Sequence, residues 1–193
     1  MNLTNRTQLN TDELQRRMRT AADGWPLGRL RVHVRYSRRA DYSGTCYYKQ
    51  GVIYVNLGRH LAYPYRLGTS VAPAKSNARH WWKPIYTLEL VDGYQVVLFV
   101  FLHELYHWLV YRARRNPRQK ESMCDRFAAR ILVDRFGVRV RDERGRPARR
   151  EAWDIQNVEA FVSAARPLRP ARAAVRPVRS APIREGQWLL FDL

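Results

Sequence analysis

A long apolar segment is the strongest constraint on how this chain folds. Residues 93–112 read GYQVVLFVFLHELYHWLVYR, with apolar side chains on nearly every side of a helix. Asp92 is a typical N-cap residue and Gln95 is placed to return the capping hydrogen bond, so we predict a helix from Asp92 to about Arg112. The longest uninterrupted apolar run, Val96 to Leu102, is far shorter than the ~20 residues that a membrane-spanning helix needs. The segment is therefore expected to be the buried central helix of a soluble domain.

Two histidines and a glutamate interrupt this helix in the pattern His-Glu-x-x-His. His103 and His107 lie four residues apart, on one face and one turn apart, so both imidazoles can reach one tetrahedral metal ion at ~2.0 Å. Glu104 then projects beside the open coordination position, where it can take a proton from a water molecule. The alternative is a pair of hydrogen-bonded core histidines with a surface glutamate, but burying these groups without a purpose is costly. The pattern therefore predicts a catalytic zinc site with Glu104 as general base.

A catalytic zinc site needs a third protein ligand, and we expect it on the next helix. Asn116-Pro117 is a typical helix start and Gly137 a typical helix stop. The short connection makes the two helices antiparallel neighbours. Glu121 and Asp125 share one face of this helix, so Glu121 is expected to bind zinc. Asp125 is expected to accept a hydrogen bond from the other ring nitrogen of a zinc-bound histidine.

The remaining patterns predict an α+β domain over residues 1–165. Asn10 and Glu13 form a capping box for a helix that ends near Gly24, and residues 30–36 alternate as in a half-buried strand, with His33 facing solvent. Further expected elements are a hairpin formed by residues 46–48 and 52–56, an irregular segment over 57–80, a strand over 82–90 broken near Pro84, an extended piece over 138–141 and a last helix over 152–165. Together they predict a small antiparallel or mixed sheet packed on the central helix.

Two segments, HELYH at residues 103–107 and ESMCDRFAARIL at residues 121–132, resemble the compact gluzincin-type metallopeptidases, which include the SprT-like and ImmA/IrrE-like families. The second segment resembles the ImmA/IrrE pattern, whereas the helix, strand and hairpin of the front half resemble SprT. SprT-like proteins usually use a histidine as third ligand and often carry a zinc ribbon. This chain has no histidine after His107 and no Cys-x-x-Cys pair. The resemblance implies a zincin-like fold, peptidase activity and a substrate extended along a sheet edge, with residues 52–55 as that edge or its neighbour.

The chain is strongly basic, with 35 Lys and Arg against 17 Asp and Glu and a net charge of +18. This excess favours a polyanionic partner, with nucleic acid as the first candidate and an anionic membrane surface as the second. The alternative is a general basic bias with a solvated tail. Arg, Pro and Ala dominate residues 166–186, which bury too little to offset chain entropy, so we predict a disordered basic linker that binds DNA. Aromatic side chains in the domain are expected in the core and cleft wall rather than as base-stacking platforms: Tyr47, Tyr48, Tyr54, Trp81 and Trp82.

The last seven residues, QWLLFDL, are apolar again. They resemble the bacterial sliding-clamp-binding pentapeptide, with Gln187, Leu190 and Phe191 as the anchoring side chains. A short motif at the end of a flexible linker would tether the domain to replicating DNA. The alternative is that this segment docks back on the catalytic domain.

Together these features predict a zinc endopeptidase that acts on proteins at or near DNA, such as the protein adducts that the SprT resemblance implies. The N-terminal residues lack a signal peptide's apolar stretch, so a cytoplasmic, nucleoid-associated location is expected. Two alternatives are an ImmA/IrrE-like peptidase that cleaves one repressor and a non-catalytic DNA-binding adaptor with a zinc fold. The lack of a helix-turn-helix pattern argues against the first alternative, and the retention of Glu104 argues against the second.

Overall fold

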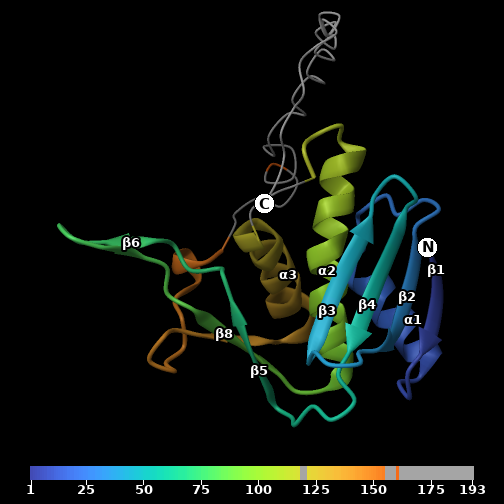
Figure 1. Cartoon of the computed structure of the whole chain (residues 1–193), viewed down its shortest axis with the longest axis horizontal. Coiled ribbons are helices and arrows are strands. Elements are labelled where there is room, and N and C mark those ends of the chain that lie inside the picture. The colour runs from blue at the N-terminus through green and yellow to red at the C-terminus, as the bar shows by residue number, and fades with distance from the viewer. Residues whose placement is uncertain (118–120, 155–159, 161–193) are drawn as a thin grey trace, which may run out of the picture.

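The computed structural model describes residues 1–117, 121–154 and 160. Within this part the chain is an α+β protein with small sheets and three α-helices (Figure 1). The helices are α1 (Thr11–Ala21), α2 (Gly93–Arg112) and α3 (Glu121–Phe136), followed by one 3-10 turn (Arg150–Ala152). The predicted linker 166–186, the motif at 187–193 and nearly all of the last predicted helix lie outside the described residues.

The first sheet is mixed and has four strands. These are β1 (Asn2–Arg6), β2 (Arg31–Tyr36), β3 (Tyr42–Tyr47) and β4 (Val52–Leu57), in the order β1-β2-β4-β3. β1, β2 and β4 run parallel, and β3 is antiparallel to β4 at the edge. The predicted strand over 30–36 and the predicted hairpin are thus confirmed. β1 was not predicted, because its residues are mostly polar and its partner β2 lies beyond α1.

A second sheet and a small hairpin follow in the chain. β5 (Tyr65–Thr69), β8 (Tyr86–Leu90) and β9 (Arg139–Arg141) form an antiparallel sheet, while β6 (Lys75–Ser76) pairs with β7 (Trp81–Trp82). The prediction of an irregular segment over 57–80 was therefore wrong. β5 has too short an alternation to be recognised, and its partner β8 lies far along the chain. The predicted break near Pro84 is confirmed, since it separates β7 from β8.

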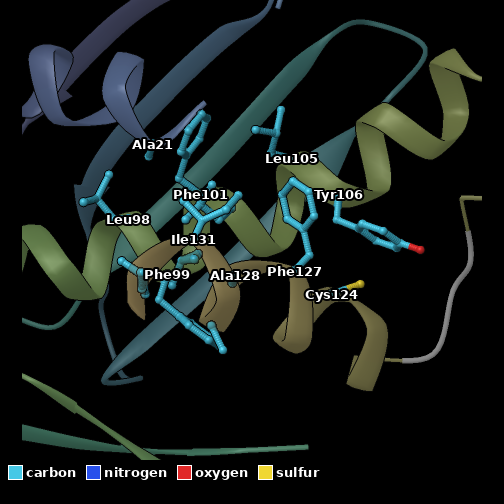
Figure 2. Packing of buried hydrophobic residues seen from close by; sticks show 14 of the residues in the cluster. Ala21, Leu98, Phe99, Phe101, Leu105, Tyr106, Cys124, Phe127, Ala128 and Ile131 are labelled. Atoms are coloured by element: carbon cyan, nitrogen blue, oxygen red, sulfur yellow. The ribbon is translucent and has the colours of Figure 1, made fainter. Parts of the chain in front are cut away.

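α2 lies between the first sheet and α3 (Figure 1). Asp92 caps it by accepting a hydrogen bond from the Gln95 backbone nitrogen at 2.8 Å, as predicted. Fifteen of its twenty residues are buried, which explains why it is apolar all round. Figure 2 shows side chains of α2 and α3 filling the space between the helices. There the ring of Phe127 lies 5.4 Å from that of Tyr106, and Ala128 is small enough to let the two helices approach closely.

Three of the aromatic residues that were expected in the core or cleft wall are exposed instead. Tyr47 is 50% exposed, Trp82 42% and Trp81 71%. Trp81 and Trp82 lie on the two-stranded β6–β7 ribbon, which has no buried face, while Tyr47 alternates outward on β3. No helix among the described residues has the length and apolarity needed to cross a membrane.

The cap of α2 can be tested with a matched pair of substitutions at Asp92. Asp92→Ala should lower the free energy of unfolding by about 1 kcal/mol, because it leaves the Gln95 N–H without its acceptor. Asp92→Asn keeps an acceptor and should cost clearly less, although it weakens the ion pair with Arg17 at 3.3 Å. Urea denaturation followed by circular dichroism measures both. Equal losses would show that the ion pair, and not the cap, stabilises this end of α2.

Candidate metal centre

His103 and His107 lie on the side of α2 that faces the start of α3. They are half-buried in a stretch of the helix whose other side chains are buried, and their ring centroids are 5.5 Å apart. The spacing of four residues places both imidazoles at one opening of the α2–α3 interface, as the sequence predicts.

Both ring nitrogens of His103 lie beside carboxylates from α3. Nδ1 is 3.0 Å from Asp125 Oδ1, and Nε2 is 2.9 Å from Glu121 Oε2. Burial opposes the charged ring, but the hydrogen bonds to Asp125 and Glu121 outweigh it and raise the pKa of His103 to about 9. The same contact with His103 lowers the pKa of Glu121. Asp125 thus lies where a residue that orients His103 is expected.

His107 is held by a partner that the sequence did not reveal. Its Nδ1 lies 2.6 Å from the backbone carbonyl oxygen of Pro117. A carbonyl only accepts hydrogen bonds, so Nδ1 carries the hydrogen and Nε2 is the ring's acceptor. Burial lowers the pKa of His107, which favours this neutral form. Cys124 Sγ lies 3.3 Å from that Nε2.

Cys124 joins the two histidines in a cluster that could hold a metal ion. One ligand atom from each of the three residues lies within 4.8 Å of the others. Cys124 is fully buried, and burial together with Glu121 raises the pKa of its thiol well above the usual range. Cys46 and Cys124 are not joined in a disulfide. Sequence reasoning missed Cys124, although its position three residues after Glu121 on the same helix was an available signal.

Glu104 lies on the other side of the histidines, against the edge strand β3. Its carboxylate accepts a hydrogen bond from the backbone N–H of Cys46, and burial raises its pKa to about 7. It borders a cleft of about 330 Å³ together with His103 and Glu121. The rest of the lining comes from both sheets and both helices: Tyr42, Gly44, Gly68, Phe99, Val100 and Asp125.

α3 also fixes the far wall of this cleft. Asp125 Oδ2 accepts a hydrogen bond from the Ser70 backbone nitrogen at 2.6 Å, and Arg126 Nε donates to the Val71 carbonyl oxygen at 2.8 Å. These bonds tie the loop after β5 to the helix that carries Glu121. β5 itself lines the cleft through Gly68, and β3 lines it through Tyr42 and Gly44.

The structure brings together the five site residues that were predicted within the described part of the chain: His103, Glu104, His107, Glu121 and Asp125. His33 lies apart from them, on the outer side of β2. The motif residues Gln187, Leu190 and Phe191 lie outside the described residues. Comparison with protein-family models, with curated proteins and with solved structures found no match. The function is therefore inferred from the residues of the site and their geometry.

Proposed function

We propose that this chain is a zinc-dependent endopeptidase with a zincin-like fold that cleaves proteins at or near DNA. One observation carries the peptidase assignment. Two imidazoles from one helix direct Nε2 toward α3, while the Glu104 carboxylate lies in an open cleft beside a free strand edge. This combination supports hydrolysis of an extended peptide next to a metal ion.

The donor groups fit a zinc ion. Asp125 and Pro117 occupy the Nδ1 atoms, which leaves both Nε2 atoms for a metal, and Glu121 and Cys124 supply an oxygen and a sulfur nearby. Nitrogen, oxygen and sulfur ligands in a tetrahedral set are typical of zinc. We assign Glu121 as the third ligand, because its carboxylate lies at the open cleft beside His103 Nε2. Cys124 is fully buried behind it.

The open edge of β3 offers the backbone groups that an extended substrate needs. The Gly58 N–H donates to the Asp41 carbonyl oxygen, and this pair sets the alternation of the β3–β4 ladder. Ser43 and Thr45 therefore bond to β4, whereas Gly44 directs its N–H and C=O away from it. No described strand pairs with β3 on that side. A peptide that pairs there passes directly over Glu104.

Glu104 carries out the proton transfers in this proposal. Zinc held by His103, His107 and Glu121 would supply Lewis-acid chemistry, which would polarise the scissile carbonyl and activate a water molecule. The Glu104 carboxylate accepts the proton of the attacking water and returns it to the departing amine. The Cys46 N–H keeps the carboxylate in place. The net charge of +18 supports action at DNA, with residues 166–186 as one contact.

Metal content distinguishes the two possible third ligands. Glu121→Ala should remove most of the bound zinc, as should His103→Ala and His107→Ala, because a stable catalytic site needs three ligands. Cys124→Ala is the matched control on the same helix and should keep it. Asp125→Ala should weaken zinc affinity about 10–100-fold. Inductively coupled plasma mass spectrometry after dialysis against a mild chelator gives the zinc-to-protein ratio. If Cys124→Ala lost its zinc and Glu121→Ala kept it, the third ligand would be Cys124 Sγ and not the Glu121 carboxylate.

The general base is tested by Glu104→Gln, which is nearly isosteric. The variant should keep its zinc and its melting temperature but cleave fluorescein-labelled casein roughly 10²–10⁴-fold more slowly, because the amide cannot accept the proton. Glu143→Gln, at an exposed glutamate on the second sheet's side, is the control and should keep full activity. Comparable turnover in the two variants would show that a residue other than Glu104 is the general base.

The close approach of β3 to Glu104 requires a glycine at position 44. A Cβ atom there would lie 2.7 Å from Glu104 Cγ and 2.8 Å from Val100 Cγ1. Gly44→Ala should therefore displace the carboxylate and slow cleavage on the order of 10²-fold, while zinc content stays unchanged. Thr4→Ala, at an exposed position of β1 that does not line the cleft, is the control and should have little effect on cleavage. Full activity in Gly44→Ala would mean that Glu104 does not need its present position.

A further inference from the structure

The face of the four-stranded sheet that points away from α2 is open and basic. β1 to β4 contain no Asp or Glu. Strand alternation places three arginines and three rings on this face, all exposed or half-buried: Arg6, Arg31, His33, Arg35, Tyr47 and Tyr54. The opposite face, with Val32, Val34, Ile53 and Val55, belongs to the core. This outer face takes no part in the cleft described above.

The three arginines of this face form two cationic positions, one at Arg6 and Arg35 and one at Arg31. The strand register puts Arg6 directly beside Arg35, while Arg31 lies four residues before Arg35 on the same strand, about 13 Å away. Some arginines elsewhere in the described residues form ion pairs with carboxylates, for example Arg17, Arg130, Arg141, Arg146 and Arg150. In the part of the chain that the structure describes, Arg6, Arg31 and Arg35 form none. Their charges are therefore available to an external anion.

An aromatic group begins at His33, between Arg31 and Arg35 on β2, and extends across β4 to the β3 edge. The His33 and Tyr54 rings stack at 5.0 Å, and Tyr47 meets Tyr54 edge-on at 5.8 Å. The Arg35 guanidinium lies 5.0 Å from the centre of the Tyr54 ring. Two hollows of about 500 Å³ and 210 Å³ adjoin here, and Arg35 and Tyr54 line both. Tyr47, which is half exposed, borders the larger hollow.

We propose that this outer sheet face binds single-stranded nucleic acid. Phosphates would contact the arginines on β1 and β2, and bases would stack on the exposed Tyr47 at the β3 edge of the same face, a combination typical of proteins that bind single strands with little sequence preference. Arginines alone would bind any polyanion. The exposed Tyr47 ring, which lines the same hollow as Arg31 and Arg35, adds a surface on which a planar base can stack. This assignment does not depend on the peptidase activity, because none of its residues borders the metal centre.

The cationic contacts are tested in the full chain, so that residues 166–193 contribute equally to every variant. The double variant Arg31→Gln with Arg35→Gln is compared with Arg19→Gln plus Arg144→Gln, two exposed arginines away from this face. Binding to a fluorescein-labelled 15-nucleotide oligodeoxythymidine is measured by fluorescence anisotropy from 50 to 200 mM salt. The sheet pair should bind more weakly and lose about 1.4 units of salt slope relative to the control pair, because two phosphate contacts disappear. Equal affinity and slope in the two pairs would overturn the proposal.

The stacking contact is tested with Tyr47→Leu against Tyr47→Phe. Leucine removes the aromatic face and should weaken oligodeoxythymidine binding about tenfold, whereas phenylalanine should bind as the wild type does. Oligouridine of the same length shows whether DNA or RNA is preferred, and a 15-base-pair duplex should bind more weakly than either strand. Equal binding by the Leu and Phe variants, or tighter binding of the duplex, would overturn the assignment to single strands. Unchanged zinc content in all these variants separates this result from any failure of the metal centre.

Discussion

The packing of α3 against α2 fixes the groups that make up the candidate metal centre. α2 is apolar on nearly every side, and it buries these sides between the first sheet, α1 and α3. Burial of each large side chain contributes roughly 1.5–3 kcal/mol, so the position of α2 is set by its apolar residues and not by the histidines. A buried polar group without a partner costs roughly 1–3 kcal/mol. The contacts of His103 with Asp125 and of His107 with Pro117 remove that cost.

The parts of the fold that depend on local signals could be predicted from the sequence. The caps at Asn10 and Asp92 and the stop at Gly137 follow from residue type and spacing alone, and the β3–β4 hairpin follows from alternation on both sides of a short turn. The spacing of His103 and His107 also places them on one face regardless of the rest of the chain. These features lie in segments whose partners are only a few residues away.

The features that sequence reasoning missed depend on distant partners. β1 and β5 are short strands whose neighbours lie beyond a helix or a long loop, so no local pattern marks them. The Pro117 carbonyl meets His107 only because of the path that the chain takes between α2 and α3. Cys124 reaches the histidines because of the rotation of α3 about its axis. That rotation is set by packing around Phe127 and Ala128, which spacing on a single helix does not specify.

Asp125 connects the metal centre to the wall of the cleft through a single side chain. One of its oxygens accepts from His103 and the other from the Ser70 backbone, so both partners are hydrogen donors. An amide of the same shape has one oxygen and one NH₂ group, and it would set a donor against a donor at one of the two contacts. Only a carboxylate satisfies both at once. The carboxylate of Asp125 therefore couples the orientation of an imidazole on α2 to the course of the loop that follows β5. These two elements lie far apart in the sequence.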